Sequence, residues 1–228
     1  MLQLLGITFV LFDMDGTLTD TQRLQPWAVR RYALGSKVPF REVQRRMASV
    51  YYHNHFTWVN PKTPVLLSKA LDISVLRLLV AGPLMAFQVL RGMRKERLFA
   101  DAVATLTTLK DNGFMVGLAT NGTKFEVKHK ISSVIDLFDV LVTSSDVSRK
   151  KPDPEMIAVG MRKAGRKPEE TLYVGDTLVD MLAAANAQTH FALVGTGTFG
   201  PEVVRVGQDR PEHVFPSLTA LRDFLLPP

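Results

Sequence analysis

Two aspartates separated by one residue, Asp13 and Asp15, are the clearest candidates for chemistry in this sequence. They come directly after the apolar stretch 7–12, and Gly16 follows them. A short apolar run rich in β-forming residues predicts a buried parallel strand, and open α/β sheets bind their ligands at the carboxyl ends of such strands. Since buried carboxylates need a compensating cation, the pair predicts a cation-binding site at the edge of a sheet.

Three more polar segments follow apolar stretches farther along the chain. Taken alone, each has an ordinary structural explanation as a turn, a helix cap or a solvated loop. Together they are more informative, because the carboxyl ends of parallel strands meet at one edge of a sheet. The segments are Thr120-Asn121-Gly122 after residues 114–119, Lys150-Lys151-Pro152-Asp153-Pro154 after residues 138–143, and residues 175–180 after residues 172–174.

The elements that must position these residues alternate from residue 100 onward. Strand and helix in strict turn predict an α/β fold with a parallel sheet and right-handed crossovers. The expected strands are residues 7–12, 114–120, 138–143, 171–174, 189–194 and 213–215, and the expected helices are residues 99–112, 123–135, 154–164, 178–187 and 218–226.

Residues 20–98 differ in character from the rest of the chain. They show helical periodicity interrupted by proline and glycine, which predicts an all-α insert, or lid, between a core of residues 1–19 and 99–228. The insert contains 14 Lys and Arg against 4 Asp and Glu, whereas the remainder contains 14 against 18. A lid with a net charge of +10 over an acidic site would attract an anionic substrate, although solvated helix faces explain most such charges.

The composition excludes several classes of protein. With no cysteine among its 228 residues, the chain has neither disulfides nor thiolate metal sites, and it suits the reducing cytoplasm. The apolar N-terminus lacks a basic leader and a cleavage site, so we interpret it as the first strand. Residues 73–93 are apolar enough to be tested as a membrane span, but Arg77, Arg91 and the central Gly82-Pro83 argue against one.

The segment 195–200 matches the dinucleotide-binding pattern G-x-G-x-x-G as a string. It follows a late strand, runs into Pro201, and precedes no strand with a ribose-binding acid. Because a nucleotide site needs that context, we interpret the segment as a loop at the sheet edge.

The four polar segments together resemble the core motifs of the haloacid dehalogenase-like hydrolases, a superfamily whose nucleophile is an aspartate. The resemblance covers nearly the whole chain, with motifs at residues 7–20 and 114–195 and a helical insert where some members carry an α-helical cap. It implies a Rossmann-like parallel sheet flanked by helices, with the insert as a lid. The form Asp-x-Asp-Gly-Thr is similar to the phosphate-handling members, since the dehalogenases lack the second aspartate.

Phosphate chemistry suggests a role for each of the first two acids. A phosphate monoester resists attack because its oxygens are negative and its leaving group is poor. Asp13, at the end of the first strand, is the expected nucleophile and would form an aspartyl-phosphate. Asp15 is placed to protonate the leaving oxygen and then to deprotonate the water that hydrolyses the intermediate. Acting as an acid requires a raised pKa, which a crowded carboxylate site would provide.

Carboxylates without cysteine or clustered histidine favour a hard cation, and Mg²⁺ suits a phosphate site best. Asp13 and Asp176 are the expected side-chain ligands, and the resemblance adds the backbone carbonyl of Asp15. Asp180 is expected to lie behind these ligands, where it holds Lys151 or binds the metal through water.

The remaining candidates concern the phosphate itself. Thr120 and the backbone amide of Asn121 are expected to bind phosphoryl oxygens at a helix N-terminus. Lys151 is expected to offset the charge between nucleophile and phosphate, because a lysine directly before a proline matches the family pattern. On residue type alone, Arg149 and Lys150 compete for this role.

These residues predict a Mg²⁺-dependent phosphomonoester hydrolase that acts on a small soluble phosphate, as a monomer or a homodimer. Phosphoglycolate phosphatase is the nearest familiar type, and pyrophosphate, a nucleoside monophosphate or a sugar phosphate fits the same site. A phosphomutase is an alternative, although the resembling β-phosphoglucomutases carry Glu-Asp where this chain has Gly175-Asp176. A non-enzymatic alternative is nucleic-acid binding through the basic insert, against which the complete set of acids and lysine argues.

Overall fold

The computed structural model describes residues 6–20, 98–197 and 213–226, together with residues 65, 68, 69, 72 and 74–76. The chain divides into two compact units, and the three long described ranges lie in the first of them. The lid expected at residues 20–98 lies almost wholly outside the described residues. Within it, residues 65, 68, 69, 75 and 76 are helical.

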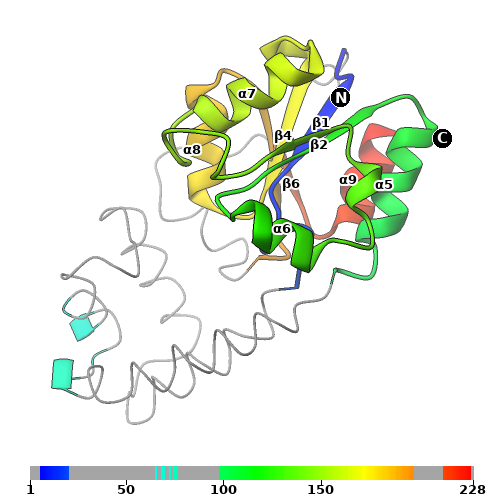
Figure 1. The fold of residues 1–228 in the computed structure, drawn as a ribbon. Helices are drawn as coiled ribbons and strands as arrows, with labels where there is room; N and C mark the ends of the chain where they lie inside the picture. Colours follow the sequence, from blue (N-terminus) through cyan, green and yellow to red (C-terminus); the bar gives the residue numbers. More distant parts are fainter. Residues whose placement is uncertain are drawn as a thin grey trace. The chain divides into compact units, whose positions relative to one another are not determined.

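A six-stranded sheet forms the centre of the first unit (Figure 1). Its strand order is β3-β2-β1-β4-β5-β6, and all neighbouring pairs are parallel. The expected α/β fold with a Rossmann-like sheet is therefore confirmed. The strands are β1 (Phe9–Phe12), β2 (Met115–Ala119), β3 (Val140–Val142), β4 (Thr171–Gly175), β5 (His190–Val194) and β6 (His213–Phe215).

Helices cover both faces of this sheet, with α5 and α9 on one face and α7 and α8 on the other (Figure 1). None of the helices in the described part of the chain is long and apolar enough to span a membrane. The helices are α5 (Ala102–Asp111), α6 (Lys124–Lys130), α7 (Glu155–Ala164), α8 (Leu178–Asn186) and α9 (Leu218–Leu225), with short 3-10 turns η2 (Ile135–Leu137) and η3 (Pro168–Glu170).

Strand β1 lies in the middle of the sheet and is buried on both faces. Phe9 and Leu11 pack into the apolar cluster beneath α7 and α8, whereas Val10 and Phe12 pack into the cluster beneath α5 and α9. Since successive side chains of a strand point to opposite faces, a strand covered on both sides is apolar at every position. This explains the uninterrupted apolar run that precedes Asp13.

The observed elements agree with the expected ones to within three residues at every end but one. The exception is the helix expected to continue to residue 135, because α6 ends at Lys130. Ser132 and Ser133 follow that end, and serine hydroxyls compete for backbone hydrogen bonds in a helix. Hydrophobic periodicity alone therefore overestimated the length of this helix.

The insert begins and ends at adjacent points of the first unit. Thr19 and Leu98 form an antiparallel bridge, and the Phe99 amide donates a hydrogen bond to the Leu18 carbonyl at 2.9 Å. A segment inserted between neighbouring positions leaves the surrounding core intact. Asp13 and Asp15 thus remain joined to the sheet although a long segment separates them from its other strands.

Gly117 in β2 faces two β1 side chains so closely that a larger residue does not fit. A Cβ atom at this position would lie 2.7 Å from Leu11 Cδ1 and 2.8 Å from the Phe9 ring, and both side chains are fully buried. We expect Gly117→Ala to lower the free energy of unfolding by about 1–3 kcal/mol, the usual cost of overpacking a core. Urea denaturation measures this change.

The control for this variant is Val103→Ala on the exposed side of α5, which should change the unfolding free energy by less than about 0.5 kcal/mol. An unchanged or increased unfolding free energy for Gly117→Ala would show that the two β1 side chains can move aside.

Candidate active site

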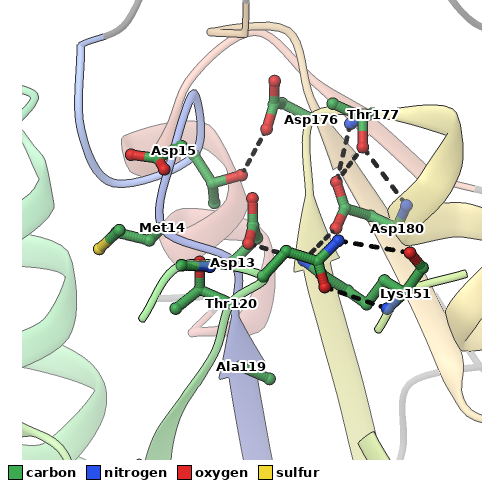
Figure 2. Close-up of polar contacts among 12 residues, drawn as sticks. Asp13, Met14, Asp15, Ala119, Thr120, Lys151, Asp176, Thr177 and Asp180 are labelled. Carbon is green, nitrogen blue, oxygen red and sulfur yellow. Dashed lines mark hydrogen bonds and ion pairs between the residues drawn. The ribbon is translucent and has the colours of Figure 1, made fainter. Parts of the chain in front are cut away.

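The polar segments that follow the strands meet at the carboxyl edge of the sheet (Figure 2). β2, β1 and β4 are neighbours, so Thr120, Asp13 and Asp176 follow strands that lie side by side. The Asp13 amide donates to the Val174 carbonyl at 2.8 Å, and the Thr120 amide donates to the Val142 carbonyl at 3.1 Å. Hydrogen bonds of the sheet ladder therefore fix the backbone from which these side chains project.

Lys151, from the loop between β3 and α7, links two of the acids. Its Nζ atom donates to Asp13 Oδ1 at 2.7 Å and to Asp180 Oδ1 at 2.6 Å, and all three side chains are buried. Burial opposes the charged form of Lys151, but the carboxylates of Asp13 and Asp180 outweigh this effect and raise its pKa well above the ordinary value. Lys151 is thus a fixed positive charge beside Asp13.

Two further side chains hold Lys151 in place. The hydroxyl of Tyr173, which is buried in β4, accepts a hydrogen bond from Lys151 Nζ at 2.7 Å and donates to the Ala119 carbonyl at 2.9 Å. The Asn121 side chain accepts from the Lys151 amide at 3.0 Å and donates to the Lys151 carbonyl at 3.3 Å. Sequence reasoning missed both contacts; the only signal for Tyr173 was a hydroxyl between the apolar residues Leu172 and Val174.

Asp176, after β4, is enclosed by backbone from two loops. Thr17 Oγ1 donates a hydrogen bond to Asp176 Oδ1 at 3.0 Å. A Cβ atom added at Gly16 or at Gly197 would overlap the Asp176 carboxylate. Gly16 also has a φ angle of +91°, which favours glycine. Only glycine at these two positions lets the backbone approach the carboxylate so closely.

The described part of the segment 195–200 contributes to this enclosure. Residues 195–197 form a turn after β5, and Thr196 Oγ1 donates a hydrogen bond to the Gly16 carbonyl at 2.9 Å. The sequence predicted a loop at the sheet edge here, and the turn lies directly against the segment that contains Asp13 and Asp15. Residues 198–200 lie outside the described part.

The Asp15 carboxylate does not join the other acids. Its Oδ1 atom accepts hydrogen bonds from Lys130 Nζ at 2.8 Å and from Thr19 Oγ1 at 3.1 Å, and Figure 2 shows it turned away from Asp176. Lys130 extends from the last turn of α6, and its side chain is only 4% exposed. Nothing in the sequence distinguishes Lys130 from neighbouring lysines, because only the fold brings it to Asp15.

Thr120 is buried at the end of β2, and its hydroxyl accepts a hydrogen bond from the Gly122 amide at 3.1 Å. The next helix, α6, begins at Lys124, and the Thr123 side chain caps it by accepting from the Glu126 amide. Asn121 therefore lies in the loop before the helix rather than in its first turn. The binding of phosphate by Thr120 and the Asn121 amide stays a prediction.

The buried site contains more negative than positive charge. Asp13, Asp176 and Asp180 each present an oxygen within 4.8 Å of the others, and Lys151 offsets one of these three charges. Burial, with repulsion from Asp180, raises the pKa of Asp13 to about 7 and the pKa of Asp176 well above its usual range. A divalent cation would balance the other two charges, so the group fits a metal ion.

The contacts of Asp180 indicate which acids are better placed to bind that ion directly. Asp180 Oδ1 accepts from Lys151, and its Oδ2 accepts from the Thr177 amide at 3.0 Å. Because both of its oxygens already have partners, Asp13 and Asp176 are the better candidates for direct ligands. Carboxylate oxygens in this arrangement suit a hard cation such as Mg²⁺.

Several known proteins resemble this chain. It is 34% identical over 123 residues to the pyrophosphatase PpaX of Halalkalibacterium halodurans, which covers 53% of this chain and 56% of that one. It is 29% identical over 196 residues to PpaX of Bacillus cereus, with 82% and 83% covered. The solved structure of a predicted phosphoglycolate phosphatase from Haemophilus somnus matches with a TM-score of 0.62 at 18% identity, covering 96% of this chain and 97% of that one.

The family comparison agrees with the resemblance that the sequence motifs indicated. The model of the haloacid dehalogenase-like hydrolases matches residues 7–188, a range that contains every acid and lysine described above. Since this match spans most of the sequence, the protein belongs to the haloacid dehalogenase-like hydrolases and is an enzyme of the hydrolase class.

Proposed function

We propose that this hydrolase is a Mg²⁺-dependent phosphatase that cleaves a small phosphorylated compound through an aspartyl-phosphate at Asp13. The observation that supports this most is the pairing of a buried carboxylate with a buried ammonium group, since Asp13 Oδ1 lies 2.7 Å from Lys151 Nζ. A carboxylate beside a fixed positive charge can attack an anionic phosphoryl group, because the lysine reduces the repulsion between them.

In the first step, a carboxylate oxygen of Asp13 bonds to phosphorus while the bond between phosphorus and the leaving oxygen breaks. The leaving oxygen needs a proton, which Asp15 supplies. Because Asp15 is hydrogen-bonded to Lys130 and Thr19 in this structure, its side chain must turn toward Asp13 to deliver that proton.

In the second step, water attacks the phosphorus of the aspartyl-phosphate. Asp15, now ionised, takes a proton from that water, the bond to Asp13 breaks, and inorganic phosphate leaves. One side chain thus acts first as an acid and then as a base, and the Asp13 carboxylate is restored for the next cycle.

The other site residues hold the charges in place. Asp13, Asp176 and the backbone carbonyl of Asp15 would bind Mg²⁺, which when bound neutralises phosphoryl oxygens and orients the phosphate for attack. Asp180 keeps Lys151 beside the nucleophile. Thr120 and the Asn121 amide would bind phosphoryl oxygens at the end of β2.

Two substrates have support from the comparisons. The relatives from Halalkalibacterium halodurans and Bacillus cereus are named pyrophosphatases, so pyrophosphate is the first compound to test. The Haemophilus somnus protein, similar in fold, is named a predicted phosphoglycolate phosphatase, and phosphoglycolate is the second. Both are small anions, as expected from the sequence.

A phosphomutase fits this site less well than a hydrolase. The β-phosphoglucomutases that the sequence resembles carry Glu at the position of Gly175, and a Cβ atom there would overlap Asp180 in this structure. A side chain at this position would displace Asp180 and so disturb Lys151. This favours transfer of the phosphoryl group to water.

The proposed nucleic-acid alternative depends on the basic segment 20–98, which lies almost wholly outside the described residues. The lid and its role in attracting anions depend on the same segment. These expectations stay predictions, as does the monomeric or homodimeric state.

The purified protein should release phosphate from a small phosphorylated metabolite when Mg²⁺ is present, and a colorimetric assay over a panel that includes pyrophosphate and phosphoglycolate measures this. A chelator should abolish release, and excess Mg²⁺ should restore it, because the unbalanced acids need the cation. Undiminished phosphate release in the presence of the chelator would rule out a metal requirement. No release from any compound of the panel would rule out the proposed phosphatase activity.

Asp13→Asn should lower kcat by about 10³-fold or more, because an amide oxygen is too weak a nucleophile for the covalent step. Steady-state phosphate release with the best substrate of the panel measures this loss. The matched control is Asp136→Asn, which makes the same chemical change at an exposed position of η2 and should leave kcat unchanged. Near-normal turnover by Asp13→Asn would rule out the aspartyl-phosphate.

Asp15→Asn should slow hydrolysis of an alkyl phosphate far more than hydrolysis of p-nitrophenyl phosphate, because a good leaving group departs without a proton. A difference of about 10²-fold between the two losses is the expected size for a general acid. Parallel kcat measurements on the two esters test this. Equal losses would mean that Asp15 has some role other than protonating the leaving oxygen.

A further inference from the structure

We propose that Tyr173 is a positioning residue of this site, whose hydroxyl fixes the Lys151 ammonium group between the two carboxylates that it bridges. The Tyr173 hydroxyl contacts Lys151, the Ala119 carbonyl and Asp180, so it acts on the reaction through Lys151. The inference rests on the proposed function, because the placement of Lys151 affects turnover only if phosphoryl transfer takes place at Asp13.

The Lys151 ammonium group has three N–H bonds, and each of them has an acceptor. Asp13 Oδ1 lies at 2.7 Å, Asp180 Oδ1 at 2.6 Å and the Tyr173 hydroxyl at 2.7 Å. A buried ammonium group needs all of its donors satisfied. Tyr173 is the neutral member of the three, so it satisfies the third donor without adding a negative charge to the acids.

The Tyr173 hydroxyl is itself held in one orientation. Its single proton is accepted by the Ala119 carbonyl at 2.9 Å, whereas Asp180 Oδ1 is farther away at 3.3 Å. Burial raises the pKa of Tyr173 well above the ordinary value, so the hydroxyl keeps this proton. With the proton directed at Ala119, the oxygen presents a lone pair to Lys151.

The bond to Ala119 also connects two parts of the site. Ala119 is the last residue of β2, and Thr120, the expected phosphate-binding residue, follows it. Tyr173 in β4 therefore joins the lysine to the end of β2, across the strand that leads to Asp13. A rigid connection of this kind keeps the positive charge in register with both the nucleophile and the phosphate.

A purely structural role is the alternative for Tyr173. Its ring is fully buried, and it stacks with Phe191 at 6.5 Å between ring centroids. Phenylalanine would preserve this packing and remove only the hydroxyl. Tyr173→Phe therefore separates the effect of the hydrogen bonds from the effect of the ring.

We expect Tyr173→Phe to lower kcat about tenfold, the effect of one lost hydrogen bond to a charged group. KM should change by less than about twofold, because the hydroxyl does not contact the substrate. The matched control is Thr171→Val in the same strand, whose buried hydroxyl donates to the Lys167 carbonyl at 2.8 Å, at the end of β4 away from the site. This control should leave kcat unchanged, and equal kcat values for the two variants would overturn the proposal.

A double mutant separates positioning of Lys151 from general damage. In a Lys151→Met protein, which has no ammonium group to position, adding Tyr173→Phe should cause no further loss of kcat. A further loss of about tenfold in that background would overturn the proposal, because the hydroxyl would then act through some other group.

Nuclear magnetic resonance of isotope-labelled lysine side chains gives a readout that needs no turnover. In the wild-type protein the Lys151 ammonium protons should exchange slowly with water, since all three are hydrogen-bonded and buried. Exchange should be faster in Tyr173→Phe and unchanged in Thr171→Val. Fast exchange in the wild type would itself overturn the proposal, even if Tyr173→Phe failed to fold.

These measurements distinguish failure of the inference from failure of the proposed function. If Asp13→Asn abolishes turnover but Tyr173→Phe matches the wild type, only the role of Tyr173 is wrong. If Asp13→Asn remains active, the proposed mechanism is wrong, and the proton-exchange measurement still tests the hydrogen bond between Tyr173 and Lys151.

Discussion

The site depends on a balance of charge inside the protein. Three buried carboxylates lie close together, and one buried ammonium group bridges two of them. None of these groups is stable alone in a medium of low polarity, because each has lost its water. Together they form a hydrogen-bonded group with an excess of negative charge, which makes it suitable for a divalent cation and for chemistry on an anion.

The parallel sheet is what makes this balance possible. Asp13 and Lys151 are 138 positions apart in the sequence, yet each follows a strand whose carboxyl end reaches the same edge. Helices on both faces keep water from the strands, and the apolar run of β1 leads the nucleophile to the centre of that edge. The charged residues occupy the one part of the core where strands end and backbone turns can approach them.

Much of this arrangement could be predicted from local patterns. Alternating strand and helix signals gave the α/β fold, and the helix expected to reach residue 135 was the one element whose end was clearly wrong. Asp13 and Asp15 were selected because two carboxylates at a buried strand end need a cation, whereas Asp176 and Asp180 were selected because they follow another expected strand of the same sheet. The contacts of Tyr173, Lys130 and the Asn121 side chain were not predicted, since a tyrosine in an apolar strand or a lysine in an exposed helix looks ordinary until the fold supplies its partner.

The sequence by itself determined which residue types lie at the ends of the strands, because periodicity and short-range chemistry are local properties of a chain. Only the tertiary structure decided how those residues are oriented. The Asp15 carboxylate turns away from the other acids and pairs with Lys130, and Gly16 and Gly197 enclose Asp176. Such contacts join segments that are far apart in the sequence, and hydrogen-bond geometry between them is set by packing rather than by spacing along the chain.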